Sequence, residues 1–207
     1  MNEQPDLVRY VSAKISRIQG MYFGHQRSDA AAVLAKLRRG VAKEPGADTW
    51  AWGHVVDGLP KQYLGRTDSA TSGEKAAYVA LTLYAVHQQS KTMPMHRPGP
   101  SMGRSIRQLG AVRGTGGASD AVKRRFDALM SSATFNELQH HARGLIQQLR
   151  AADIPLDYGR LAEDIRLLQS QVTANGVQLR WGRDYAFEEF GSEARITSFE
   201  HEEGNAS

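Results

Sequence analysis

Between Gly110 and Gly117 the chain reads Gly-Ala-Val-Arg-Gly-Thr-Gly-Gly, and a glycine-rich segment of this kind is one way to bind phosphate. A Walker loop needs Gly-Lys-Ser/Thr at a fixed distance after its first glycine, and a dinucleotide-binding loop needs a third glycine where Ser119 stands. Neither pattern is complete. We therefore interpret the segment as a loop whose glycines allow backbone N–H groups and Arg113 to approach a phosphate closely.

Side chains for metal binding or catalysis are sparse in this sequence. Glu137 and His141 are the only pair with ligand-like spacing on one helix face, and no third ligand follows at a recognisable distance. No nucleophile elbow supports Ser-His-Asp catalysis. The acids that could hold two metal ions scatter around one helix start, namely Asp153, Asp157, Glu163 and Asp164. We predict no catalytic residue, no metal site, no cofactor and no enzyme, with a small-molecule or hydrolytic enzyme kept as a third hypothesis.

The charged residues are divided unevenly along the chain. The net charge is +4, but residues 188–207 hold six acids against one base and carry −5. Residues 1–187 then carry +9, from 25 basic and 16 acidic side chains, which indicates an anionic partner. Between Arg97 and Arg125 seven basic residues accompany a single acid, Asp120. The alternative is that these basic residues only solvate helix faces.

Arginine outnumbers lysine by 19 to 7. The planar guanidinium binds phosphate through two hydrogen bonds and stacks on unpaired bases, so nucleic acid is the polyanion that we expect. The sequence contains no zinc finger, leucine zipper or RNA-recognition signature. We therefore predict contacts to the sugar-phosphate backbone rather than readout of bases.

The composition is that of a soluble globular protein. The chain has 207 residues, 41% of them hydrophobic, which suits one domain or two small ones. The absence of cysteine excludes disulfides, thiolate metal sites and cysteine nucleophiles, and it fits a reducing compartment. No stretch approaches the roughly 18 apolar residues that span a bilayer, and the first residues lack the pattern of a signal peptide. We expect a cytoplasmic protein that does not interact with a membrane.

Apolar residues recur at helical spacing in almost every segment, which predicts an all-α fold. We expect a compact bundle of about eight helices, or two packed sub-bundles, followed by a frayed acidic C-terminal tail. An N-terminal helical half would cover residues 1–92 and a C-terminal helical half residues 101–190. The Pro-rich stretch 93–100 would join them as a linker or an ordered crossing loop, and the flexible tail would cover residues 191–207.

Capping residues predict where the helices begin and end. Thr71 and Glu74 have the spacing of a capping box and open a helix that is apolar on most sides and therefore central. Asn175-Gly176 is expected to end a helix on which Val172 points inward. The other helix starts are expected at Ser28, Ser101, Ser119, Asp157 and a second capping box formed by Thr134 and Glu137.

Several segments, taken in their order and spacing between residues 28 and 190, resemble the small-subunit (CasB) family of type I-E CRISPR Cascade surveillance complexes. Val122-Lys123 stands where an acidic residue often precedes the paired arginines, and Tyr158 replaces a common tryptophan. The match is less clear at residues 50–92 and after Phe190. The segments that carry the resemblance are Ala35-Lys36-Leu37-Arg38-Arg39, Ser101-Met102-Gly103-Arg104, Lys123-Arg124-Arg125-Phe126, Ile154-Pro155-Leu156-Asp157-Tyr158 and Arg180-Trp181-Gly182-Arg183-Asp184-Tyr185.

The resemblance implies a non-catalytic, all-helical protein that is present as two copies beside the other Cascade subunits. Such a protein would help hold the duplex of CRISPR RNA and target DNA and the displaced strand, and so stabilise the R-loop in antiviral defence. The matched segments contain the basic residues Arg38, Arg39, Arg104, Lys123, Arg124, Arg125, Arg180 and Arg183.

Helical-wheel positions add Arg107 and Arg143 to these candidates and independently favour Arg104 and Arg124 as outward-facing. Arg113 joins them through the glycine-rich segment. Arg38 lies at the edge of an apolar stripe, where a protein contact is an alternative role. A second hypothesis remains open for the whole chain: a scaffold subunit whose basic face binds acidic patches of partner proteins rather than nucleic acid.

Overall fold

The computed structural model describes residues 6–114 and 117–186, and the regular secondary structure of this part of the chain is helical, as the apolar periodicity predicts. Nine α-helices and one short 3-10 helix lie in it, without any strand. Their bounds are α1 Asp6–Phe23, α2 Arg27–Arg39, α3 Thr49–Val56, η1 Lys61–Tyr63, α4 Ser72–His87, α5 Met102–Arg113, α6 Gly117–Met130, α7 Phe135–Ala151, α8 Tyr158–Leu168 and α9 Gln171–Ala186. The expected tail, residues 191–207, lies outside the described residues.

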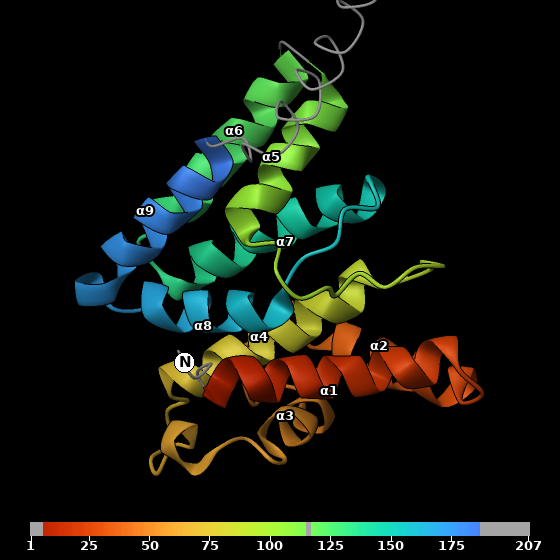
Figure 1. Cartoon of the computed structure of the whole chain (residues 1–207). Helices are drawn as coiled ribbons and strands as arrows, with labels where there is room; N and C mark the ends of the chain where they lie inside the picture. The colour runs from red at the N-terminus through yellow and green to blue at the C-terminus, as the bar shows by residue number, and fades with distance from the viewer. Residues whose placement is uncertain (1–5, 115–116, 187–207) are drawn as a thin grey trace, which may run out of the picture.

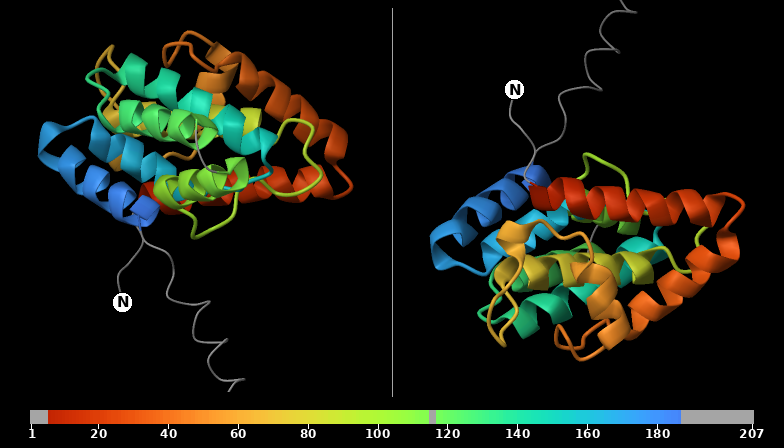
Figure 2. Two further views of the ribbon diagram at one scale, coloured as in Figure 1. Left: turned by 90° about the horizontal axis from the view of Figure 1, so that it is seen from above. Right: turned by 90° about the horizontal axis from the view of Figure 1, so that it is seen from below.

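The helices are arranged around α4 (Figure 1). Helices α1, α2 and α3 pack on one side of α4, and α7 and α8 pack on another. Helices α5, α6 and α9 form a group at the far end from α2 and α3, and α7 and α8 lie between that group and the first four helices (Figure 1). The views from above and below show α8 running beside α1 (Figure 2).

Helix α4 is central because its sequence offers no polar face. The run from Ala76 to Ala85 is buried at every position, including the hydroxyls of Tyr78 and Thr82, which donate hydrogen bonds to backbone oxygens. The predicted capping box opens this helix: Thr71 Oγ1 accepts from the N–H of Glu74 at 3.1 Å, and the Glu74 carboxylate accepts from the N–H of Thr71 at 2.7 Å.

The Pro-rich connection at residues 93–100 is an ordered crossing, which resolves the choice left open by its composition. Met95 and His96 are buried in it. Its backbone pairs with the segment before α8, because the N–H of Leu156 donates to the oxygen of Met95 at 3.1 Å and the N–H of Arg97 donates to the oxygen of Leu156 at 3.2 Å. This pairing fixes where α5 begins relative to α8.

Three of the predicted helix starts are confirmed in the second half of the chain. The side chains of Ser101, Thr134 and Asp157 each accept a hydrogen bond from the backbone N–H three residues further on. The second capping box is only half formed, since the Glu137 carboxylate accepts from the N–H of Ala133 instead of Thr134.

Two other predicted starts are wrong. Helix α2 begins at Arg27, before Ser28, and its N-cap Gln26 makes no side-chain cap. Helix α6 begins at Gly117, before Ser119. In each case the serine lies within the first helical turn, so its cap-like sequence position does not mark the boundary.

The glycine-rich segment is shorter as a loop than expected. Helix α5 continues through Gly110 to Arg113, and only then does Gly114 adopt a φ of +80° that favours glycine. Gly110 is buried, and a Cβ there would lie 3.5 Å from the Ser119 hydroxyl oxygen, so this glycine sits where α5 and α6 approach each other.

The predicted end of the helix after Asp157 is also wrong. Helix α8 ends at Leu168, and Asn175-Gly176 lies inside the next helix, α9. Val172, expected to point inward, is 91% exposed. The apolar repeat that seemed to continue from α8 is interrupted by a turn at Ser170, where the N–H groups of Thr173 and Ala174 both bond to the Ser170 oxygen.

Candidate nucleic-acid interface

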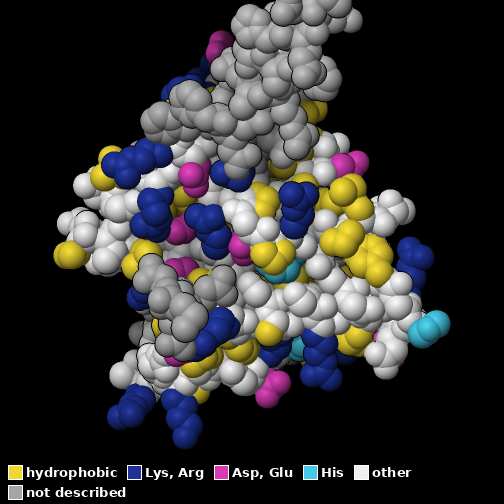
Figure 3. Space-filling view, viewed as in Figure 1, with side chains coloured by type: hydrophobic (Ala, Val, Ile, Leu, Met, Phe, Trp, Pro, Cys, Tyr) yellow, Lys and Arg dark blue, Asp and Glu magenta, His cyan; other side chains and the backbone are white. Residues whose placement is uncertain are grey.

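The structure divides the predicted basic site residues among three places. The first lies at the end of α2, the second on α5 and α9, and the third on α6 and α7. Figure 3 shows Lys and Arg side chains spread across the part of one face that α5 and α9 form. The three sets are Arg38 and Arg39; Arg104, Arg107, Arg113, Arg180 and Arg183; and Lys123, Arg124, Arg125 and Arg143.

A polar groove lies between α6 and α7 and brings three of the predicted arginines together. Its volume is about 670 Å³. Small residues at Ala121, Ala128 and Gly144 leave the hollow open. The polar side chains around it are Arg124, Arg125, Arg143, His140, His141 and Gln147. We call these residues the α6–α7 groove.

The local sequence explains why these side chains point outward. On α6 the apolar residues Val122, Phe126 and Leu129 are buried, which leaves Arg124 and Arg125 on the exposed side. On α7 the buried stripe of Leu138, Ala142 and Leu145 leaves Arg143 exposed. Because only a short connection joins the two helices, they pack as antiparallel neighbours and their exposed sides meet along one edge.

The arginines of the α6–α7 groove carry charge that the described part of the chain does not neutralise. Arg124, Arg125 and Arg143 make no ion pair with any acid in residues 6–114 or 117–186. Lys123 differs, because its ammonium lies 2.7 Å from the carboxylate of Asp127, and this bond raises the pKa of Lys123. Three unneutralised guanidinium groups around one hollow are suited to an anion with several oxygens.

Two histidines complete the groove. The rings of His140 and His141 are 5.3 Å apart and nearly perpendicular. The sequence offers His141 only as a metal ligand paired with Glu137. In residues 6–114 and 117–186 no three His, Asp or Glu side chains come close enough to hold a metal ion. The packing of α6 on α7 places both rings beside the arginines of the groove, and the sequence of α7 alone does not show this neighbour.

The second basic set lies where α9 packs on α5. Ser101 Oγ at the start of α5 donates a hydrogen bond to the Asp184 carboxylate in the last turn of α9. Gly103 allows this contact, because a Cβ there would lie 2.2 Å from the backbone oxygen of Trp181. Arg104 and Arg183 are exposed beside this contact, and Arg107 is half-buried one turn further along α5. We call Arg104, Arg107 and Arg183 the α5–α9 basic face.

Arg180, on the same helix as Arg183, has a structural partner. Its guanidinium lies 2.8 Å from the Asp164 carboxylate on α8, and the other oxygen of that carboxylate accepts from Trp181 Nε1 at 2.7 Å. Burial raises the pKa of Asp164, while the bond to Arg180 opposes that rise. Arg180 thus holds α9 on α8, a role the resemblance did not imply.

The first set, Arg38 and Arg39 at the end of α2, lies apart from the other two. Helix α2 packs on α1, α3 and α4, at the other end of the molecule from α5 and α6 (Figure 1). Arg38 is half-buried and donates a hydrogen bond to the oxygen of Ala85 at 3.5 Å, near the end of α4. Burial and the nearby Arg150 lower the pKa of Arg38. Arg39 is exposed and could contact a ligand without disturbing this packing.

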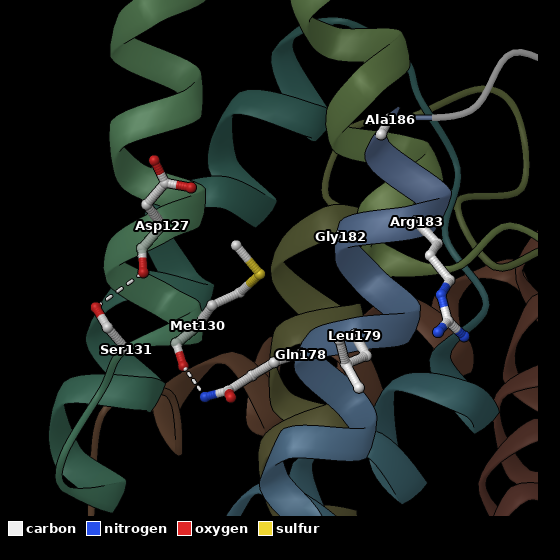
Figure 4. A pocket seen from close by; sticks show the side chains of 8 residues that line it. All are labelled: Asp127, Met130, Ser131, Gln178, Leu179, Gly182, Arg183 and Ala186. Carbon is white, nitrogen blue, oxygen red and sulfur yellow. Dashed lines mark hydrogen bonds between the residues drawn. The ribbon is translucent and has the colours of Figure 1, made fainter.

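An apolar groove lies between α6 and α9, which the sequence analysis did not anticipate (Figure 4). Met130, Leu179 and Ala186 line it, and Gln178 Nε2 closes one end by donating to the oxygen of Met130 at 2.7 Å. Arg183 also borders this groove, but its side chain points away from α6 (Figure 4). Leu179 is 49% exposed, so apolar surface is available here.

In residues 6–114 and 117–186 no helix is long and apolar enough to cross a membrane. No curated protein matches the chain.

Solved structures of similar proteins share this helical arrangement. A CasB from Thermobifida fusca matches with a TM-score of 0.71 and 29% identity, over 88% of this chain and 99% of that one. A CasB from Thermus thermophilus matches with a TM-score of 0.58 and 23% identity, over 84% of this chain and 96% of that one. A chain of a CRISPR RNA-guided surveillance complex matches with a TM-score of 0.64 and 22% identity, over 86% of this chain and 92% of that one.

The family comparison agrees with the fold. Residues 33–185, which run from within α2 almost to the end of α9, match the model of the CRISPR-associated protein Cse2. The matched range contains all three basic sets, the α6–α7 groove and every lining residue of the apolar groove except Ala186. The chain belongs to the Cse2 family.

Proposed function

We propose that this protein is a non-catalytic, nucleic-acid-binding subunit of a CRISPR surveillance complex. In that complex it helps hold the duplex of CRISPR RNA and target DNA, together with the displaced DNA strand. The observation that carries the proposal is the convergence of Arg124, Arg125 and Arg143, without acidic partners in the described chain, on the α6–α7 groove. This chain belongs to the Cse2 family, and its fold is similar to that of a chain in a CRISPR RNA-guided surveillance complex. Both findings support nucleic acid as the anion that binds in the groove.

The physical effect of such a site is on the persistence of the R-loop. Exchange of a DNA duplex for an RNA–DNA duplex is nearly neutral in free energy, so contacts between protein and sugar-phosphate decide whether the opened state lasts. Each phosphate that an arginine neutralises also releases condensed counterion, which favours binding at low salt. The α6–α7 groove offers the positive charge and hydrogen-bond donors that bind phosphate oxygens, which suits contact with the sugar-phosphate backbone.

The partners follow from the same proposal. They are CRISPR RNA, target DNA, the other subunits of the complex and a second copy of this chain. The apolar groove between α6 and α9 supports a protein partner, because Leu179 and Met130 expose apolar surface beside the basic sets. Binding protein partners there and nucleic acid in the α6–α7 groove are compatible, since the two grooves use different sides of α6.

A filter-binding titration of single-stranded DNA against salt tests the proposal. Arg124→Ala with Arg143→Ala removes two groove contacts and is expected to weaken binding about tenfold near 0.1 M salt. The slope of log affinity against log salt should become shallower by about 1.4, or about 0.7 for each lost contact with a single strand. The matched control is Arg17→Ala with Arg66→Ala, which removes the same charge from exposed positions on α1 and the loop before α4.

The two hypotheses for the basic surface give different results in this assay. Loss of affinity in the groove variant alone supports the nucleic-acid site. If the groove and control variants lose the same affinity for DNA, the loss follows from the lower net charge of the protein, and this result contradicts a defined site. If the unaltered protein does not retain DNA at all but still co-purifies with other subunits, the scaffold hypothesis replaces this one.

A further inference from the structure

The α5–α9 basic face lies beside the point where the chain leaves α9. The hydrogen bond from Ser101 to Asp184 and the close approach of Gly103 to Trp181 join the first turn of α5 to the last two turns of α9. Arg104 follows Gly103 directly, and Arg183 precedes Asp184. The described chain therefore leaves α9 next to the same arginines.

The helix directions show which way the chain is heading. Gln178 on α9 contacts Met130, whereas the rings of Trp181 and Tyr185 lie against Phe126, so α9 runs antiparallel to α6. Helix α5 is also antiparallel to α6, since Gly110 near its end lies against Ser119 near the start of α6. Helices α9 and α5 consequently run in the same direction, and α9 ends while pointing along α5.

The segment that follows has the complementary charge. Beyond Ala186 the sequence continues for 21 residues, and its first acids are Glu188, Glu189 and Glu193. Residues 188–207 carry −5 in total, against +9 on the rest of the chain. The seven residues from 187 to 193 can extend over about 23 Å, whereas Arg104 and Arg113 are separated by about 14 Å along α5.

We propose that the acidic segment 188–193 docks on the α5–α9 basic face of its own chain and competes there with nucleic acid. This inference rests on the proposed function and adds a regulator to it. A short tether gives the segment an effective concentration in the millimolar range, so weak ion pairs are enough for partial occupancy. Nucleic acid displaces the segment because its regularly spaced phosphates contact the α6–α7 groove at the same time.

The inference predicts a gain of affinity when the acids are neutralised. E188Q/E189Q/E193Q keeps the chain length and should bind single-stranded DNA about fivefold more tightly near 0.1 M salt, the effect expected of three exposed ion pairs. Its log affinity should fall more steeply with log salt than that of the unaltered chain. In the variant these three carboxylates no longer pair with the arginines before DNA binds, so more ions are released when DNA contacts them. A chain that ends at Ala186 should show the same gain.

The matched control removes three acids further along the tail. E200Q/E202Q/E203Q changes the net charge equally and should leave affinity within about twofold, because in this proposal only the acids of segment 188–193 pair with the α5–α9 basic face. When R104A/R107A is already present, E188Q/E189Q/E193Q should give no further gain in affinity. A double-mutant cycle requires this result if the acids and the arginines interact directly.

Equal gains in the proximal and distal variants, or no gain in either, overturn the docking inference while leaving the nucleic-acid site in place. Failure of all variants, including the unaltered chain, to bind DNA contradicts the proposed function instead. Circular dichroism of each variant checks that the helices are retained.

Discussion

Trp181 on α9 donates a hydrogen bond from its indole Nε1 to the carboxylate of Asp164 on α8, over 2.7 Å in a buried position. The same carboxylate pairs with Arg180, so two consecutive residues of α9 share one acid. This contact sets the position of α9, and with it the α5–α9 basic face and the apolar groove against α6.

Asp164→Ala is expected to destabilise the protein by about 2 to 3 kcal/mol, because it leaves the buried indole N–H without an acceptor and Arg180 without its partner. Urea denaturation followed by circular dichroism measures the change. Asp127→Ala is the control, since Asp127 only pairs with exposed Lys123 on the same helix, and its denaturation midpoint should stay nearly unchanged. Similar midpoints for the two variants would contradict the structural role of Asp164.

The packing of α9 on α5 depends on Gly103. Gly103→Ala places a methyl group 2.2 Å from the oxygen of Trp181, where the neighbour is backbone and cannot rotate away. We expect a loss of about 1 to 3 kcal/mol in unfolding free energy. Gly182→Ala on α9 meets no atom within 4 Å and should instead be neutral or stabilising by up to about 1 kcal/mol. A tolerated Gly103→Ala would show that α5 and α9 are not in this close contact.

Buried histidines make stability depend on pH. His87 is fully buried, its Nδ1 lies 2.9 Å from the hydroxyl of Tyr158, and burial lowers its pKa to about 3. The unfolded chain binds a proton near pH 6.5 while the folded protein does not, so the stability from neutral His87 is complete above that pH. It is lost as the pH falls from about 6.5 towards 3, at up to about 1.4 kcal/mol per pH unit.

Denaturant midpoints measured between pH 8 and pH 5 check this dependence. His87→Gln should flatten the decline below pH 6.5, although it lowers stability at every pH. His140→Gln, at an exposed position, should leave the slope of stability against pH as it is. An unchanged slope in His87→Gln would contradict the account, and the remaining dependence should then be sought at His96, whose pKa burial also lowers.

The α6–α7 groove can be blocked without removing a charge. Gly144 lines the groove, and a Cβ there would be 3.4 Å from the Arg125 guanidinium, an ordinary contact distance. Gly144→Leu should fill the hollow and weaken single-stranded DNA binding by about fivefold while raising helix propensity. Gly53→Leu on α3, which meets no atom within 4 Å, is the matched control. If the Gly144→Leu protein binds as well as the control, the ligand does not enter the groove.

The sequence predicts much of this architecture because local signals are strong in α4 and α7. Thr71 and Glu74 form their capping box, and the all-round apolar run that follows becomes the buried central helix. The boundaries that failed lie where tertiary contacts override local preference. Asn175-Gly176 stays helical inside α9, since Val177 and Trp181 beyond it are buried. Gly110 stays helical because α5 must continue against α6.

The candidate site was predicted only in part for the same reason. Periodicity places Arg124 and Arg143 outward on their own helices, but it does not show that the two helices are neighbours. It also does not separate arginines with structural partners from those without. The sequence does not distinguish Arg180 and Arg38 from Arg124. The structure does, because Arg180 pairs with Asp164 on α8 and Arg38 donates to the oxygen of Ala85 near the end of α4.

Cross-linking of the protein to single-stranded DNA that contains photoreactive thymine analogues, followed by mass spectrometry of the peptides, tests the central claim most directly. The account predicts that the strongest cross-links fall within residues 117–151, which carry both sides of the α6–α7 groove, and that Arg124→Ala with Arg143→Ala reduces them. Cross-links confined to α1, α2 and α3, or unchanged in that variant, would contradict it.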